Sequence, residues 1–441
     1  MSTKEKLGDE EVAALESAIR SEDGLWAYVG DAFGGLLAEG LDKLKRHFRE
    51  AGGGDVFLTP TSSGTASIQV ALGALKIPAG SEVIVTPITD SGSVSPIVFH
   101  NSIPVFADVD PRSGLITPES VKAKLTHRTR AVIAVHLTGS PVDVPGIRTM
   151  LDQEGHEKVL IIEDVAQGLG ASLDGKPLGT LGDAGCFSLN PWKHITSGEG
   201  GFVLTKDKRS FYSCMSYADK HRDRLKSPYA EDGIFKGFGH SFRLSQLEGA
   251  MLVAQIDKLD GIAKGRHEFG LALDEAFRTR TDYIPQTHLP KSKPSFFGYM
   301  FTTNNPVDLS LKTGSMKSEI RTLLKPYGVT WGGKSYTLDD LPIFEYDAFK
   351  NRNFGAIEET DPPGERPIWP AEMVSRAVYG EINAEGRDFY DYTHEDWTAC
   401  PDAKSYLQRS FWIRMSEKCK PEDAPKIVDE IAKVFQREGI S

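Results

Sequence analysis

The segment that decides the fold spans residues 187–201 and reads FSLNPWKHITSGEGG. An apolar run ends at Ser188, a single lysine follows at Lys193, and a glycine-rich turn closes the segment at 198–201. Most lysines are solvated surface residues, but one held between an apolar strand and a tight turn is not expected on an open face. A lysine amine can form a Schiff base with an aldehyde cofactor, most commonly pyridoxal phosphate. Lys193 is therefore the first candidate for a chemical role.

Short apolar runs alternate with helical patterns around this segment. We predict helices at 65–75, 118–125 and 144–154, and strands at 56–58, 82–85, 103–108, 131–136, 159–163, 186–188 and 201–204. This alternation predicts an α/β fold with a largely parallel sheet that is covered on both faces. Ligands of such sheets bind at the carboxyl ends of the strands, which is where the chemistry-bearing residues of this chain occur.

The remaining chain is arranged on either side of this α/β region. Helical patterns precede it at 10–20 and 33–48, and another follows at 244–278. Prolines at 285, 290 and 294 mark a crossing into a second lobe, which has helical patterns at 315–324 and 421–437. We expect an N-terminal helical segment (1–50), a large cofactor-binding domain (51–285) and a small C-terminal domain (286–441). Its irregular stretch at 333–405 is either a functional lid or a surface insertion.

Composition narrows the class of protein. The 441 residues are 39% hydrophobic and 26% charged, an ordinary globular balance with enough apolar material for a sizeable core. A net charge of −11 argues against a broadly basic nucleic-acid surface. The four cysteines show neither metal-ligand spacing nor a disulfide framework. No signal peptide or membrane-spanning stretch is apparent. We expect a cytoplasmic protein without a metal, nucleic-acid or membrane partner.

Two further segments place polar groups directly after predicted strands. Residues 61–67 (TSSGTAS) open a helix, where free backbone N–H groups and hydroxyls suit an anion, although a simple helix cap is the ordinary interpretation. Residues 163–171 (EDVAQGLGA) place a carboxylate where it can keep a pyridine nitrogen protonated, or merely cap a helix. Each signal is weak alone. The order of anion loop, acidic strand end, lysine and glycine turn is far more specific.

That order resembles the DegT–StrS family of pyridoxal-phosphate sugar aminotransferases. The resemblance covers roughly residues 30–265 and rests on the segments 63–65, 104–110, 135–139, 163–167, 188–201 and 242–248. It implies fold type I, with a mostly parallel seven-stranded sheet in a large domain and a smaller α+β C-terminal domain. It also implies pyridoxal 5′-phosphate as the cofactor and a homodimer with shared active sites.

The resemblance also assigns roles by position. Lys193 would form the Schiff base and move protons, while Asp164 would pair with the pyridine nitrogen. Gln167 would approach the ring hydroxyl. The phosphate would be held by Gly64, Thr65 and Ser188.

Two cofactor-binding positions depart from the family pattern. Asp90 stands where the family usually stacks an aromatic residue on the ring. Ser241 stands where an asparagine from the partner subunit usually reaches the phosphate. Some relatives have histidine in place of the lysine and act as sugar dehydratases, so Lys193 favours transamination.

Five residues are candidate substrate contacts, with ordinary packing as the alternative for each: His136, His194, Trp331, Lys334 and Tyr336. Three of them lie in or next to residues 328–335 (GVTWGGKS), which fit the nucleotide phosphate-loop pattern literally. Such a loop needs a strand before it and a helix after it, whereas a predicted helix precedes it here. A turn is the ordinary interpretation, and nucleotide binding is the remote alternative.

The functional hypothesis is transfer of an amino group from glutamate or glutamine to a keto sugar. The acceptor is nucleotide-linked or free, and one subgroup of relatives aminates eight-carbon keto-deoxy sugar acids. Two alternatives stay open at this point. The same cofactor also serves elimination, dehydration or decarboxylation, and Asp90 keeps that interpretation open. A nucleotide-binding protein without this cofactor is the other alternative.

Overall fold

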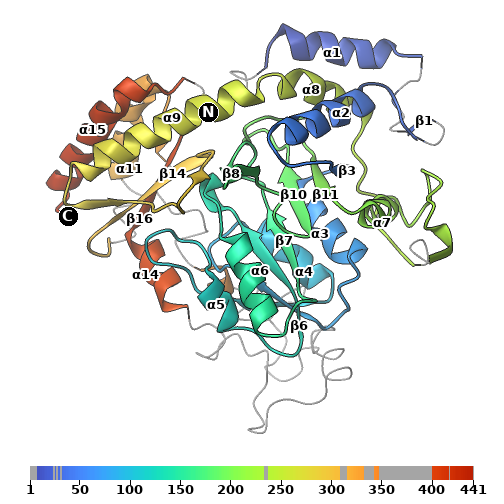
Figure 1. Cartoon of the computed structure of the whole chain (residues 1–441). Helices are drawn as coiled ribbons and strands as arrows, with labels where there is room; N and C mark the ends of the chain where they lie inside the picture. The colour runs from blue at the N-terminus through green and yellow to red at the C-terminus, as the bar shows by residue number, and fades with distance from the viewer. Residues whose placement is uncertain are drawn as a thin grey trace, which may run out of the picture.

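The computed structural model describes residues 7–22, 25, 28–29, 32–232, 237–307, 315–331, 342–346, 400–416 and 418–440. Its centre is a seven-stranded sheet in the order β3-β11-β10-β7-β6-β4-β5 (Figure 1). The strands are β3 (Phe57–Thr61), β4 (Glu82–Val85), β5 (Ile103–Phe106), β6 (Thr129–Val135), β7 (Leu160–Asp164), β10 (Ala184–Ser188) and β11 (Gly201–Thr205). All seven predicted strands are present, with small shifts at their ends.

The direction of the strands confirms the predicted, largely parallel sheet. β10, β7, β6, β4 and β5 pair in parallel, and only β11 runs antiparallel to its neighbours β10 and β3. Every residue of β4 (EVIV) and β5 (IPVF) is buried, as expected for strands covered on both faces. The carboxyl ends of the parallel strands therefore meet at one edge of the sheet.

Five helices connect and cover these strands: α3 (Gly64–Ala74), α4 (Ser95–Phe99), α5 (Pro118–Lys122), α6 (Val144–Gln153) and α7 (Lys208–Ala218). Helix α3 packs against α7 and against strands β10 and β11. This packing sets the first turn of α3 beside the end of β10, which is where the lysine segment begins. The predicted helices at 65–75, 118–125 and 144–154 correspond to α3, α5 and α6.

The N-terminal helices α1 (Asp9–Arg20) and α2 (Gly35–Glu50) both pack on α8 (Gln246–Ile256). A single helix was predicted at 244–278, but the structure has two, α8 and α9 (Leu259–Arg278). The Lys258 backbone N–H donates to the Gln255 carbonyl three residues earlier, a 3₁₀-type bond that interrupts the α-helical pattern. Figure 1 shows the α8–α9 pair running from the N-terminal helices to the C-terminal lobe.

The C-terminal lobe contains an antiparallel sheet in the order β12-β14-β16-β15. Its elements are β12 (Tyr283–Pro285), β14 (Gly298–Thr303), α11 (Ser315–Leu324), β15 (Thr330–Trp331), α14 (Pro401–Arg409), β16 (Ser410–Arg414) and α15 (Ala424–Arg437). Short strands elsewhere form two small sheets: β1 (Tyr28–Val29) with β2 (Ala32–Phe33), and β13 (Ser292–Lys293) with β8 (Ser172–Leu173) and β9 (Lys176–Pro177). The predicted helices at 315–324 and 421–437 match α11 and, after a 3₁₀ turn, α15.

The described residues form three buried clusters. One fills the C-terminal lobe together with α9, and another joins α2 and α8 to one face of the large sheet through residues such as Phe187 and Phe202. The third lies mainly under the rest of the sheet and also includes Met300 and Trp412 of the C-terminal lobe. The clusters thus cross the expected boundaries near residues 50 and 285, and the division into three units stays a prediction. The predicted irregular stretch at 333–405 lies largely outside the described residues. Across the described ranges, no helix is both long and apolar enough to cross a membrane.

Candidate active site

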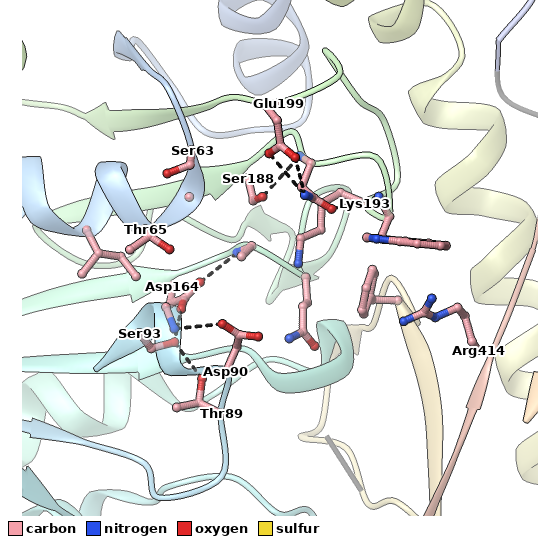
Figure 2. Close-up of a pocket in the computed structure, with 18 residues that line it drawn as sticks. Ser63, Thr65, Thr89, Asp90, Ser93, Asp164, Ser188, Lys193, Glu199 and Arg414 are labelled. Carbon is pink, nitrogen blue, oxygen red and sulfur yellow. Dashed lines mark hydrogen bonds between the residues drawn. The ribbon is translucent and has the colours of Figure 1, made fainter. Parts of the chain in front are cut away.

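A cavity of about 430 Å³ opens at the carboxyl edge of the large sheet. Figure 2 shows the first turn of α3 at one end, Lys193 and Asp164 across its middle, and Arg414 at the other end. The residues that line it are Ser63, Gly64, Thr65, Ile68, Thr89, Asp90, Gly92, Ser93, Asp164, Ala166, Gln167, Ser188, Asn190, Trp192, Lys193, Glu199, Phe297 and Arg414. The fold thus gathers segments from both lobes around one space.

The first turn of α3 forms one end of the cavity. Ser63 caps the helix, because its Oγ accepts a hydrogen bond from the Ala66 N–H at 3.0 Å. A Cβ built on Gly64 would lie 2.8 Å from the Ser188 Cβ, so only glycine allows this close approach of the helix to β10. The ordinary helix cap predicted as the alternative is present. Ser63, Gly64 and Thr65 also line the cavity, and their use as an anion site stays a prediction.

Asp164 ends β7 and is only 6% exposed. Its Oδ2 accepts a hydrogen bond from the Ser93 Oγ at 2.6 Å, and its Oδ1 accepts one from the Ala166 N–H at 3.0 Å. The Ser93 hydroxyl is in turn 2.7 Å from the Thr89 hydroxyl. This short chain of hydroxyls fixes the carboxylate in one orientation beside the cavity.

Lys193 lies in the turn after β10, where its backbone N–H donates to the Asn190 carbonyl at 2.9 Å. Its Nζ lies 4.8 Å from the centre of the Phe297 ring. Burial lowers the pKa of the Lys193 amine; the carboxylates of Asp164 and Asp90 oppose this, and Arg414 reinforces it. A lowered pKa enlarges the neutral fraction of the amine, which is the form that acts as nucleophile or base.

Gln167 and Asp90 line the same cavity as Asp164. The Gln167 Oε1 accepts a hydrogen bond from the Thr138 N–H at 2.6 Å, so the amide NH₂ is the group that can donate to a ligand oxygen. The Asp90 carboxylate accepts from the Gly92 N–H at 2.8 Å and caps a short 3₁₀ turn. Asp90 therefore has a local structural role that an aromatic residue could not fill.

Seven predicted site residues meet at this one cavity: Gly64, Thr65, Asp90, Asp164, Gln167, Ser188 and Lys193. Ser241 does not line it; its backbone pairs with Asp219, and its side chain is exposed. A role for Ser241 in the site of a partner subunit stays a prediction.

The two histidines that were candidate substrate contacts do not reach the cavity. His136 is fully buried and its Nε2 lies 3.0 Å from Glu163 Oε2, while its Nδ1 accepts from the Val142 N–H. His194 is also fully buried, with Nε2 3.1 Å from the Ser295 carbonyl. Both are held by internal partners, so the packing alternative applies to them. The Trp331 side chain, Lys334 and Tyr336 lie outside the described residues.

Several cavity residues were not anticipated from the sequence: Thr89, Ser93, Asn190, Trp192, Glu199, Phe297 and Arg414. The Asn190 Nδ2 donates to both Glu199 oxygens, at 3.0 and 3.2 Å. The Arg414 guanidinium lies 4.7 Å from the centre of the Trp192 ring and 5.2 Å from that of Trp412. Asn190, Trp192 and Glu199 flank Lys193 in the chain, so proximity to the lysine was a usable signal for them. Phe297 and Arg414 come from the other lobe and had no such signal.

Within the described residues, no group of three or more His, Cys, Asp or Glu side chains is placed to hold a metal ion. The charged and polar groups that line the cavity include the Lys193 amine, the carboxylates of Asp90, Asp164 and Glu199, the first turn of α3 and the Arg414 guanidinium. An aldehyde, a protonated ring nitrogen and an anionic group are the complementary partners of these side chains.

Known proteins provide an independent comparison. Residues 36–326 match the profile described as the DegT/DnrJ/EryC1/StrS aminotransferase family. A GDP-perosamine synthase from Vibrio cholerae is 31% identical over 299 residues, covering 66% of this chain and 76% of that protein. An L-glutamine:2-deoxy-scyllo-inosose aminotransferase from Streptomyces kanamyceticus is 33% identical over 366 residues, 82% of each chain.

Solved structures agree on the fold. An aminotransferase from Psychrobacter cryohalolentis superposes with a TM-score of 0.72 at 22% identity, covering 98% of both chains. Such neighbours have fold type I, so the predicted fold class is confirmed. The family profile covers more than half of the sequence, and the two relatives named above, 31% and 33% identical, align over 76% and 82% of their length. The chain is an aminotransferase and belongs to the DegT/DnrJ/EryC1/StrS aminotransferase family.

Proposed function

We propose that this aminotransferase uses pyridoxal phosphate to move an amino group from glutamine or glutamate onto a ketone of a sugar or a related polyol. One observation carries the proposal: Lys193 and the fixed carboxylate of Asp164 face one cavity that ends at the first turn of α3. The relatives named above support the substrate class, since one is named for L-glutamine and a cyclic keto polyol.

The residues of the cavity fit this cofactor. Gly64, Thr65 and Ser188 would hold its phosphate at the α3 terminus, where a Cβ on Gly64 would collide with Ser188. Asp164 would accept a hydrogen bond from the ring nitrogen, and the Gln167 amide would donate to the ring oxygen. When bound, pyridoxal phosphate supplies an aldehyde that condenses with amines and a ring that withdraws electrons from the substrate carbon.

The protein's own contribution is to bind, orient and move protons. Lys193 lines the same cavity as Asp164, and burial lowers the pKa of its amine, so the neutral amine would be the group that takes a proton from the donor and returns it. Asp164 cannot rotate freely, because Ser93 and Ala166 each donate to one of its oxygens. A fixed anion at that place stabilises positive charge on a ring nitrogen without reorganisation.

Arg414 gives the cavity a cation at the end opposite α3, held against Trp192 and Trp412. A guanidinium in this position suits the carboxylate of an amino-acid donor. The acceptor would then use the same space in the second half of the reaction. An eight-carbon keto-deoxy sugar acid, which also has a carboxylate, is one acceptor compatible with Arg414.

The proposal extends to assembly and location. A homodimer with shared active sites would give Ser241, which lies outside the cavity of its own chain, a place near the phosphate of the partner's site. A cytoplasmic location fits the four cysteines, none of which forms a disulfide in the described structure.

The experiment that tests the proposal is an absorbance spectrum of the purified protein with pyridoxal phosphate, before and after adding glutamine or glutamate. We expect a visible band that the donor bleaches, with release of one keto acid per site. A band that neither donor changes would favour elimination or decarboxylation. The absence of any band, even with added cofactor, would refute the cofactor assignment.

Replacing Ser93 by alanine is expected to lower kcat about tenfold, because a hydrogen bond to a charged group contributes ~1.5–3 kcal/mol and Asp164 would lose one. Stopped-flow measurement of the donor half-reaction would check this. Ser91→Ala, in the same 3₁₀ turn but outside the cavity, is the matched control. Ser93→Thr keeps the hydroxyl and should restore the rate. Equal effects of the Ser91 and Ser93 changes would contradict the role assigned to Ser93.

A further inference from the structure

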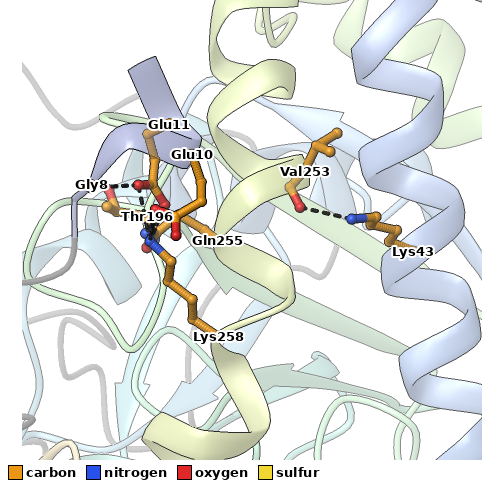
Figure 3. Close-up of polar contacts among 8 residues, drawn as sticks. All are labelled: Gly8, Glu10, Glu11, Lys43, Thr196, Val253, Gln255 and Lys258. Atoms are coloured by element: carbon orange, nitrogen blue, oxygen red, sulfur yellow. Dashed lines mark hydrogen bonds and ion pairs between the residues drawn. The ribbon is translucent and has the colours of Figure 1, made fainter. Parts of the chain in front are cut away.

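The turn that carries Lys193 is held from behind by a residue of α8. The Thr196 backbone N–H donates a hydrogen bond to the Gln255 Oε1 at 3.1 Å (Figure 3). Gln255 is fully buried and does not line the cavity. Thr196 stands only three residues after Lys193. The contact therefore holds the lysine turn from outside the cavity.

The Thr196 side chain links the two ends of that turn by hydrogen bonds. Its Oγ1 donates to the Leu189 carbonyl at 2.8 Å and accepts from the Gly198 N–H at 2.9 Å. The Ser197 N–H also donates to the Leu189 carbonyl, at 3.0 Å. A shift of Thr196 would thus be transmitted to both ends of the segment that presents Lys193.

The NH₂ group of the Gln255 side chain connects this turn to the N-terminal helix α1. The Gln255 Nε2 donates to the Glu11 Oε1 at 2.7 Å. Glu11 lies in α1 and is only 3% exposed. Its carboxylate also pairs with the Lys258 Nζ at 2.8 and 3.0 Å and accepts from the Gly8 N–H at 2.7 Å. Lys258 supplies the positive charge that makes a buried carboxylate tolerable here.

The Glu11 carboxylate determines which way the amide points. An ionised carboxylate only accepts hydrogen bonds, so the amide NH₂ must face Glu11 and its oxygen must face Thr196. Without that anion, the two orientations of the amide would differ much less in free energy, and one of them sets NH₂ against the Thr196 N–H. Glu11 is therefore more than an attachment point for α1.

We propose that α1 positions the catalytic lysine from a distance, through Glu11 and Gln255, by holding the turn at Thr196. The inference rests on the proposed function in taking Lys193 as the reacting amine. Neither Glu11 nor Gln255 lines the cavity, so both are positioning residues. The N-terminal helix thereby becomes part of the catalytic apparatus instead of a mere cover on α8.

Two other residues provide controls for effects that arise only from how the N-terminal helices pack on α8. Lys43 ties α2 to the same helix, through the Val253 carbonyl at 3.1 Å and Asp257 Oδ2 at 2.6 Å, without reaching the lysine turn (Figure 3). Glu10 neighbours Glu11 and contacts Lys258 at 3.4 Å, but it does not contact Gln255. Lys43→Met and Glu10→Gln therefore perturb the same region without touching the proposed connection.

The test compares Glu11→Gln, Gln255→Leu and these two controls in the full-length protein. Hydrogen–deuterium exchange of the Thr196 amide, without cofactor, reports on the turn. The pH dependence of Lys193 acetylation by acetic anhydride, read by mass spectrometry, reports on the amine. We expect Thr196 exchange to rise about tenfold in both test variants, because a buried hydrogen bond is lost or misdirected. The acetylation profile should shift, and kcat should fall with the donor KM nearly unchanged. Both controls should behave as the wild type.

The double variant Glu11→Gln with Gln255→Glu provides a rescue. A carboxylate at 255 can accept from both the Thr196 N–H and an amide at 11, so the Thr196 hydrogen bond is restored and the bond between positions 11 and 255 forms in the opposite direction. Slow exchange and a recovered kcat in this variant support the proposal. Unchanged Thr196 exchange in Gln255→Leu, equal effects in the controls, or faster exchange without any change in kcat would overturn it. Failure of the proposed function is distinguishable, because it would appear as full activity of a Lys193 variant.

Discussion

Replacing Lys193 by alanine is expected to lower kcat for transamination by about 10⁴-fold or more. Acid–base catalysis by a positioned side chain contributes ~10²–10⁴-fold by itself, and loss of the amine would also remove the proposed covalent attachment of the cofactor. The geometry supports so large an effect, since Lys193 is the only lysine among the described residues that line the cavity. Single-turnover kinetics with glutamine, followed by keto acid release, would measure it.

The Lys193→Arg variant separates the effect of the positive charge from that of Schiff-base formation. Arginine keeps a cation near Asp164 and Asp90 but cannot form a Schiff base, so this variant should be as inactive as the alanine variant. Lys264→Ala, an exposed lysine on α9, is the control and should retain full activity. Borohydride reduction of the wild type should leave the cofactor attached to the peptide that contains Lys193. Substantial turnover by either Lys193 variant would refute the assignment.

The sheet could be predicted because its strands carry a strong local signal. Residues 82–85 and 103–106 are short runs flanked by turn residues, and both became strands buried on both faces. The strands of the C-terminal lobe were not predicted. β14 (GYMFTT) is fully buried as well, but β12 and β15 are only two or three residues long, too short to stand out by periodicity.

The break between α8 and α9 shows a different limit. Residues 244–278 have a continuous helical pattern, and nothing at Asp257 or Lys258 is a strong helix breaker. The interruption depends on where each helix packs: α8 lies under α1 and α2, whereas α9 contacts β12 and α15. Tertiary packing of this kind overrides local propensity and is not encoded in any short window of sequence.

The candidate site was predictable where its residues lie in contiguous motifs. Asp164 and Gln167 follow one strand, and Ser188 and Lys193 follow another, so parallel pairing of β7 with β10 brings them together. Phe297 and Arg414 enter from the C-terminal lobe through β14 and β16, and residue type alone did not distinguish them from core residues. Neither candidate histidine lines the cavity, because a position after a strand does not determine which way a side chain points. The His136 side chain is directed toward Glu163 instead.

Asp164→Asn is expected to lower kcat about a hundredfold or more, comparable to the loss of one preorganised electrostatic contact in other enzymes. The change is nearly isosteric, and an asparagine oxygen can still accept from the Ala166 N–H. Ser93 would have to reverse its hydrogen bond and accept from the new amide. The variant should therefore fold normally but fail to hold a protonated ring nitrogen, since the carboxylate's negative charge is gone.

The sharpest readout for Asp164→Asn is a pH titration of the absorbance of the bound cofactor, alongside kcat. The charge at Asp164 acts on the ring, so the titration midpoint and kcat should change together while the cofactor remains bound. Asp174→Asn, an exposed residue paired with Lys291, is the control and should alter neither. A near-normal kcat with a shifted titration would show that ring protonation does not limit this enzyme. A near-normal kcat with an unshifted titration would instead mean that another group holds the nitrogen, and Asp90, a second carboxylate that acts on the Lys193 amine, would then be the residue to replace.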